Sequence, residues 1–128
     1  MMGASMSFAT VVCCMDGRIQ LPVIEYLQDR FKSDFIDNIT ASGPVGVISA
    51  SPDSDETRSM IRMIDISISL HGSEQLAIVA HHDCAGNPIP ESAQRNQIDI
   101  CKQYFAQLYP DMEIIGHWLD HACQVHES

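Results

Sequence analysis

Two short segments of the chain carry the side chains best suited to chemistry. The first begins with Cys14, which is followed at spacings of two by Asp16 and Arg18. The second places His81 three residues before Cys84. Zinc binds imidazole nitrogens and thiolates at roughly 2.0–2.3 Å in a tetrahedral shell. One histidine and two cysteines would leave the fourth position of such a shell for water or for Asp16.

Both segments follow apolar runs that are typical of buried strands. Residues 8–12 lead to Cys14, and residues 76–80 lead directly into His81. The carboxyl ends of parallel strands open into a crevice at one edge of an α/β sheet, and the strands hold that edge rigid. If the two strands are neighbours, we expect Cys14, His81 and Cys84 to converge on a single metal ion.

Together the two segments resemble the motifs of the β-class carbonic anhydrases. Cys14-x-Asp16-x-Arg18 matches the C-x-D-x-R pattern of that family. His81-x-x-Cys84 matches its H-x-x-C pattern, and the two patterns occur in the family's order. Linked motifs at the ends of two predicted strands are more specific than either motif alone. The resemblance spans most of the chain and implies an α/β fold with a mainly parallel sheet flanked by helices.

The resemblance also implies a function, a zinc lyase that hydrates carbon dioxide reversibly to bicarbonate. It assigns Cys14, His81 and Cys84 as ligands of Zn²⁺, which lowers the pKa of bound water toward ~7. It assigns the pair Asp16 and Arg18 to orient the resulting hydroxide. The family has a second state in which the aspartate binds zinc and closes the site. It further implies a homodimer or higher homo-oligomer with the pocket at the dimer interface.

The sequence departs from the family pattern near the expected pocket. Gly17 stands where serine is usual, and residues 37–43 lack the arginine of the family's R-N-A-G-like loop. Ser42 and Gly43 could therefore line the pocket only through backbone groups. The sequence before residue 8 shows no helical arm of the kind that commonly wraps a partner subunit, so assembly could differ as well.

His82 and Gly86 complete the set of residues expected at the pocket. His82 has an ordinary pKa of about 6.5, which would suit it to carry protons between the zinc water and buffer. It could equally stack on the loop without a chemical role. Asp83 is expected to cap the turn by accepting hydrogen bonds from nearby N–H groups.

Other functions fit the same residues. A zinc hydrolase of carbonyl sulfide or carbon disulfide could use the same centre. A non-catalytic protein could keep zinc as a structural ion, with Asp16 as a permanent fourth ligand. A cysteine-dependent enzyme could use Cys14 as nucleophile and Arg18 as an anion site, although the run between them is too short for a C-x5-R phosphate cradle.

Composition indicates one folded domain over residues 1–128 and excludes several partners. Apolar residues make up 45% of the chain, enough for a single core. A formal charge of −10 argues against nucleic acid and anionic membranes, and no run approaches the ~20 apolar residues of a membrane span. Residues 1–7 do not resemble a secretory signal, so the five cysteines are expected as free or metal-bound thiols in a cytoplasmic protein.

Apolar periodicity predicts strands that alternate with helices, hence right-handed crossovers and a parallel sheet. The predicted strands are residues 8–14, 35–40, 75–81 and 112–118, with a short edge strand at 122–125. The predicted helices are residues 21–31, 54–71 and 90–109, and residues 41–55 are expected to form a loop. Cys13 and Cys101 are expected to pack in the core. Cys123 and His117, His121 and His126 are expected at a solvated chain end rather than in a second metal site.

Overall fold

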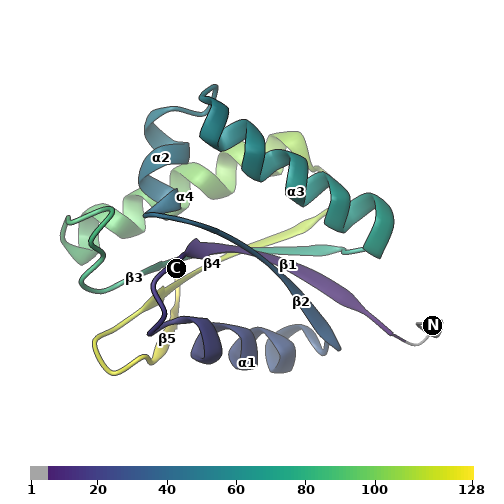
Figure 1. Ribbon diagram of the computed structural model, residues 1–128, viewed down its shortest axis with the longest axis horizontal. Helices are drawn as coiled ribbons and strands as arrows, with labels where there is room; N and C mark the ends of the chain where they lie inside the picture. Colours follow the sequence, from purple (N-terminus) through teal and green to yellow (C-terminus); the bar gives the residue numbers. More distant parts are fainter. Residues whose placement is uncertain (1–5) are drawn as a thin grey trace.

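The protein, described over residues 6–128 in a computed structural model, is built on a five-stranded sheet (Figure 1). The strands are β1 (Phe8–Cys14), β2 (Phe35–Ala41), β3 (Gln75–His81), β4 (Glu113–Leu119) and β5 (Val125–Glu127). Their order across the sheet is β2-β1-β3-β4-β5. The first four strands are parallel and β5 runs antiparallel to β4. The predicted α/β class with a mainly parallel sheet is confirmed.

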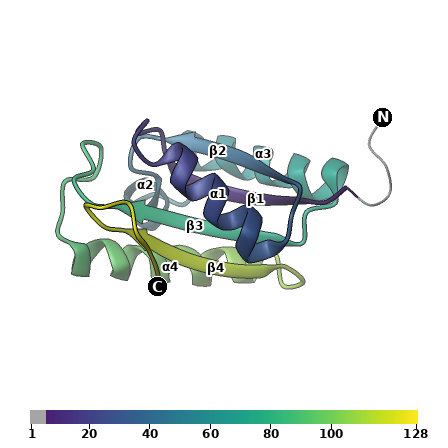
Figure 2. The same ribbon diagram turned by 90° about the horizontal axis from the view of Figure 1, so that it is seen from below.

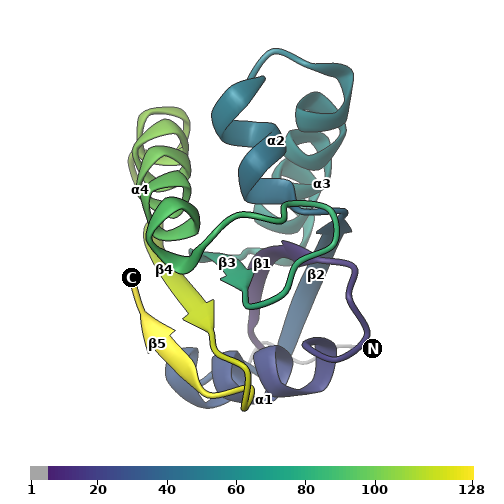
Figure 3. The ribbon, with the colours of Figure 1, turned by 90° about the vertical axis from the view of Figure 1, so that its left-hand side faces the viewer.

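Helices cover both faces of this sheet. They are α1 (Gln20–Phe31), α2 (Pro44–Ala50), α3 (Asp55–His71) and α4 (Glu91–Leu108). Figures 1 and 3 show α1 alone on one face and the other three helices together on the opposite face. None of the helices described between residues 6 and 128 is long and apolar enough to cross a membrane.

The two central strands are buried on both faces, as their continuous apolar runs predicted. Successive side chains of a strand point to opposite sides of a sheet. Val12 and Ile78 accordingly pack in the core beneath α2, α3 and α4, whereas Val11 and Val79 pack in the core beneath α1. Because side chains pack against both faces of β1 and β3, the carboxyl ends of these two strands form a rigid base for the loops that follow.

The segment predicted as a loop at residues 41–55 contains the short helix α2, so that prediction is wrong. Gly43-Pro44 and Gly46 suggested chain breaks. Instead, Gly43 adopts a left-handed φ of 59° just before the helix, and Pro44 occupies its first turn, where proline is well tolerated. Val45 and Ile48 then anchor the helix in the core.

The last strand begins three residues later than predicted. The carboxylate of Asp120 accepts hydrogen bonds from the backbone N–H groups of Ala122 and Gln124, at 2.8 and 2.9 Å. These bonds hold residues 120–124 in a turn, and pairing with β4 starts only at Val125. Of the segment predicted not to be a secretory signal, residues 1–5 lie outside the described residues.

β1 and β3 are neighbours in the sheet, and this determines which loops meet at the candidate site. The register pairs Thr10 with Leu76 and Val12 with Ile78, so both strands end at nearly the same level. Figure 2 shows the two strands side by side in the middle of the sheet. Figure 3 shows the loops after them meeting at the sheet end that faces the viewer.

Candidate metal centre

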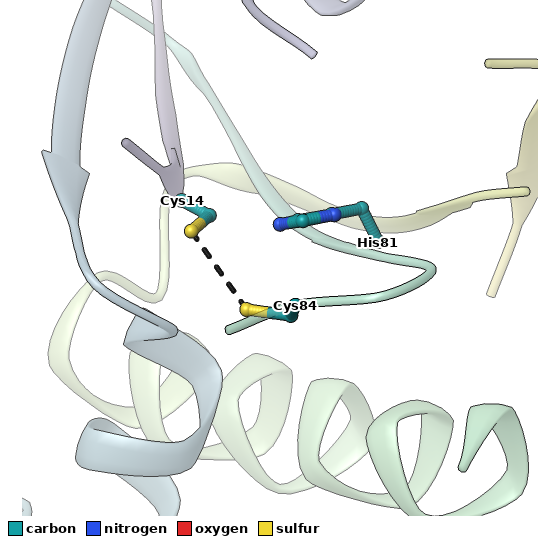
Figure 4. A group of neighbouring side chains, drawn as sticks. All are labelled: Cys14, His81 and Cys84. Atoms are coloured by element: carbon teal, nitrogen blue, oxygen red, sulfur yellow. Dashed lines mark hydrogen bonds between the residues drawn. The ribbon is translucent and has the colours of Figure 1, made fainter. Parts of the chain in front are cut away.

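Three side chains from these strand ends meet in one buried cluster (Figure 4). Ligand atoms of Cys14, His81 and Cys84 all lie within 4.8 Å of one another, and each residue is at most 5% exposed. Two sulfurs bound to one tetrahedral zinc ion at ~2.3 Å would be about 3.8 Å apart. The Sγ atoms of Cys14 and Cys84 are separated by 3.8 Å. The cluster therefore has the donor types and spacing that fit a zinc ion.

The imidazole of His81 is oriented for metal binding. Its Nδ1 lies 2.7 Å from the backbone oxygen of His82, and a carbonyl can only accept, so Nδ1 carries the proton. The lone pair of a neutral ring then resides on Nε2. Nε2 is buried without a hydrogen-bond partner, an arrangement that is costly unless a ligand is present. A metal ion would satisfy it.

Backbone N–H groups point at both sulfurs. The N–H of Gly43 donates to Cys14 Sγ at 3.5 Å. N–H groups of Gly86 and Asn87 act on the sulfur of Cys84 and favour its thiolate. Burial, followed by the neighbouring sulfur of Cys14, nevertheless raises the pKa of Cys84 above its ordinary value. Two adjacent thiolates would repel each other, so a cation bound between the two sulfurs would stabilise both.

Asp16 faces Arg18 rather than the cluster. The guanidinium donates to the carboxylate from Nη2 at 2.6 Å and from Nε at 3.0 and 3.2 Å, and the Arg18 backbone N–H adds a bond of 2.9 Å. These bonds lower the pKa of Asp16 to about 2. Its Oδ2 still lies 4.0 Å from Nε2 of His81. An ionised acceptor therefore stands beside the three ligand atoms without joining them.

Arg18 also contacts the second ligand loop. Its Nη2 donates to the backbone oxygen of Asp83 at 3.1 Å, and its Nη1 lies 3.3 Å from the Asp83 carboxylate. Asp83 was expected to cap the turn through nearby N–H groups; among the described bonds its carboxylate instead accepts from Arg18, so that prediction is wrong. Asp83 itself has a left-handed φ of 55°.

The residues expected at the pocket fall into two groups. Ser42, Gly43 and Gly86 pack against one another: a Cβ at Gly86 would overlap the Ser42 hydroxyl, and one at Gly43 would lie 2.8 Å from the backbone of Gly86. The N–H of Gly43 turns toward the sulfur of Cys14 and that of Gly86 toward the sulfur of Cys84. His82 lies on the other side, with its ring edge-on to Trp118 at 6.5 Å between centroids.

Two hollows adjoin the cluster near His82. One, of about 330 Å³, is lined by Cys84, Gln94 and Trp118 among others. A smaller one, of about 40 Å³, reaches His81 and Arg18. His82 lines both hollows, so a small molecule could approach the ligand atoms past its ring.

The remaining cysteines lie apart from the cluster. Cys13 and Cys101 are buried, and burial raises the pKa of each to about 12, in keeping with the core packing that was predicted. Cys123 approaches the backbone oxygen of Arg18 at 3.8 Å. Across residues 6–128, Cys14, His81 and Cys84 are the group of His, Cys, Asp and Glu side chains close enough to share an ion.

Sequence reasoning missed the side chains that brace the first ligand loop. Gln20, the first residue of α1, bonds to the backbone oxygens of Cys14 and Asp16, and Asn38 of β2 bonds to Gln20. Neither residue belongs to a motif. The signal available was weak: a polar residue two positions after Arg18, and an asparagine that is a poor strand former inside a predicted strand.

A family comparison and a structure comparison both relate the chain to carbonic anhydrases. A family described as "Putative carbonic anhydrase" matches residues 4–128. No curated protein matches the chain by sequence. The carbonic anhydrase of Streptococcus mutans is similar in structure, with a TM-score of 0.60 at 17% identity, covering 93% of this chain and 80% of that one.

Two eukaryotic structures are similar as well. The β-carbonic anhydrase CafD of the fungus Aspergillus fumigatus has a TM-score of 0.56 at 14% identity and covers 98% of this chain and 91% of its own. The β-carbonic anhydrase isoform I of the protozoan Trichomonas vaginalis has a TM-score of 0.53 at 16% identity, with 93% and 80% covered. At these identities the likeness establishes a shared fold.

Proposed function

Because the chain belongs to the carbonic anhydrase family, as a divergent member with the β-class fold, we propose that it is a zinc-dependent carbonic anhydrase that interconverts carbon dioxide and bicarbonate. One observation carries the proposal. The ligand atoms of Cys14, His81 and Cys84 lie within 4.8 Å of one another. The neighbouring carboxylate of Asp16 is bonded to Arg18 instead of joining them. With an ion bound, that arrangement would leave a fourth coordination position for water.

The bound ion would act as a Lewis acid and lower the pKa of water toward ~7. The protein contributes the positioning. The carboxylate of Asp16 would accept a hydrogen bond from the attacking oxygen and so would direct the oxygen's lone pair toward the carbon of the substrate. Arg18 keeps that carboxylate ionised and fixed through its forked hydrogen bonds. The hollow beside His82 gives a small uncharged substrate a route to the centre.

The geometry supports catalysis over a closed structural site. In a closed site Asp16 would be the fourth ligand. Its carboxylate would then have to exchange its bonds with Arg18 for the metal, and Arg18 would keep only its contacts to Asp83. The charge-assisted bonds of a forked arginine are among the strong hydrogen bonds of proteins, which favours the open arrangement.

Metal analysis and stopped-flow kinetics test the proposal. We expect about one zinc per chain and, for zinc-loaded protein, carbon dioxide hydration above the buffer rate at neutral to mildly alkaline pH. The variant Cys14→Ser should lose both, whereas Cys101→Ser, a change at an equally buried cysteine in α4, should keep both. Zinc-loaded protein with no rate above buffer would exclude this activity, and sulfide release from carbonyl sulfide would then identify a hydrolase on the same centre.

We further propose a cytoplasmic homodimer. β2 is an edge strand of the sheet, and Phe35 at its start is 42% exposed; edges of this kind are usually covered. All five cysteines are free, which fits a reducing compartment. Light scattering on size-separated protein measures the assembly, and a mass of one chain at micromolar concentration would exclude the dimer.

A further inference from the structure

The side chain of Gln20 joins the first ligand loop to the sheet. Its Nε2 donates to the backbone oxygen of Cys14 and to that of Asp16, both at 2.8 Å. Its Oε1 accepts from Nδ2 of Asn38 at 2.8 Å. Oδ1 of Asn38 in turn accepts from the thiol of Cys13 at 3.2 Å. A continuous chain of hydrogen bonds thus runs from β1 and β2 into the loop.

The chemistry of the partners fixes the orientation of this chain. Both backbone oxygens can only accept, so the NH₂ end of Gln20 must face them. The opposite end is then an acceptor and needs a donor, which Asn38 supplies. Replacing the amide of Gln20 by a carboxylate would set an anion against two carbonyl oxygens and would leave Asn38 as its only partner in this chain.

Besides the bonds of Gln20 and Arg18, and a contact of Cys123 with the Arg18 backbone oxygen, two backbone hydrogen bonds hold the loop. The N–H of Met15 donates to the oxygen of Ala41 at 2.8 Å, and that of Ile19 to Asp16 at a longer 3.3 Å. Gly17 at its tip has no atom near the place where a Cβ would be. Arg18 holds the side chain of Asp16. Gln20 holds the backbone oxygens of Cys14 and Asp16, and the backbone sets the position from which each of these side chains extends.

We propose that Gln20, oriented by Asn38, is a positioning residue that sets the Cys14 sulfur and the Asp16 carboxylate in place for metal binding. This inference rests on the proposed function, because it concerns the same centre. It assigns no chemical step to Gln20. Partners in the outer shell of a metal site that orient its ligands typically alter affinity or activity by 10–100-fold when they are changed.

The test compares Gln20→Glu with Gln28→Glu in the full chain. Gln28 lies on the same helix and also donates to a backbone oxygen, that of Asp34 at 2.9 Å, so it is a matched control away from the centre. Cobalt(II) is the probe, titrated against a chelator, since its visible spectrum reports thiolate coordination geometry. Alkylation of Cys14 in the metal-free protein, mapped by mass spectrometry against buried Cys101, adds a readout that needs no metal.

We expect Gln20→Glu to bind cobalt at least about tenfold more weakly, with an altered spectrum and faster alkylation of Cys14. Gln28→Glu should match the wild type in all three measurements. Asn38→Ala, on the exposed edge strand, should show the same changes at smaller amplitude, and it carries the test if Gln20→Glu does not fold.

Two results overturn the proposal and are distinguishable. If the wild type binds cobalt and neither Gln20→Glu nor Asn38→Ala changes affinity, spectrum or alkylation, Gln20 has no positioning role and the proposed function stands. If the wild type itself binds no cobalt, the proposed metal centre fails and this inference fails with it.

Discussion

At the scale of single residues, Arg18 contacts both loops of the candidate centre. It binds the Asp16 carboxylate through three nitrogen-to-oxygen contacts and reaches the backbone of Asp83 in the other loop. Its side chain is 59% exposed, so an ordinary ion pair there would contribute little to stability. The contribution of Arg18 is instead the position of the Asp16 carboxylate, because the forked guanidinium holds a carboxylate in one plane.

Substitution of Arg18 should therefore affect activity more than stability. We expect Arg18→Ala to lower carbon dioxide hydration by roughly 10–100-fold while zinc stays bound. Arg18→Lys keeps the charge but not the fork, so it should recover only part of the rate. Stopped-flow kinetics with metal analysis measures both. An unchanged rate in Arg18→Ala would show that Asp16 is not used in the form observed.

Gly86 and Gly17 make a second pair of predictions at the residue scale. A methyl group at Gly86 would overlap the Ser42 hydroxyl and press on its backbone, whereas one at Gly17 meets nothing within 4 Å. Overpacking of this kind costs about 1–3 kcal/mol, and exposed changes usually stay within about 0.5 kcal/mol. We expect Gly86→Ala to lower the free energy of unfolding by the larger amount and Gly17→Ala by the smaller, as denaturant titration would measure. Equal effects would contradict the packing described.

At the scale of elements, the helix α3 depends on its two ends. Ser54 accepts from the N–H of Thr57 at 3.2 Å, acidic residues fill the first turn, and Gly72 closes the helix at a φ of 70°. Loss of an N-cap hydroxyl typically costs ~1 kcal/mol. We expect that loss in Ser54→Ala and near wild-type stability in Ser54→Asp, by thermal unfolding. The hydrogen bonds of Ser54 go to Ser51, Thr57 and Arg58, and none reaches a ligand residue, so metal binding should be unchanged in both variants.

Elements with strong local signals were predictable from sequence, and those fixed by tertiary contacts were not. β1 and β3 were predicted with their observed bounds, since continuous apolar runs end there at ligand-type residues. α2 was missed because Gly43, Pro44 and Gly46 suggest a loop, and only burial of Val45 and Ile48 shows why a helix forms. β5 was misplaced because the carboxylate of Asp120 fixes the preceding turn.

The candidate centre shows the same division. The convergence of Cys14, His81 and Cys84 could be expected, because parallel strands bring their carboxyl ends to one edge of the sheet. The partner of Asp83 and the brace formed by Gln20 and Asn38 could not. These contacts join residues that lie apart in the chain, and no spacing rule links the side chains involved.

At the scale of the whole molecule, His117 makes the free energy of unfolding depend on pH. It was predicted at a solvated chain end, and that prediction is wrong: His117 lies in β4 with no exposed surface and no hydrogen-bond partner on either ring nitrogen. Tyr26 meets its ring edge-on at 5.0 Å. Burial, opposed by the carboxylate of Glu127 and reinforced by the charges of Arg30 and Lys102, lowers the pKa of His117 to about 4. The folded protein therefore keeps this ring neutral under conditions where an unfolded chain would protonate it.

The pH dependence of stability follows from that difference. An unfolded histidine titrates near 6.5, so below that pH the unfolded state binds one more proton and the free energy of unfolding falls until the pH reaches about 4. The loss attributable to His117 is on the order of 3 kcal/mol. We expect His117→Leu to flatten this part of the curve in urea titrations between pH 7 and 4, whereas His121→Gln, at an exposed histidine, should leave it unchanged. A His117→Leu curve as steep as that of the wild type would mean that another group carries the acid sensitivity.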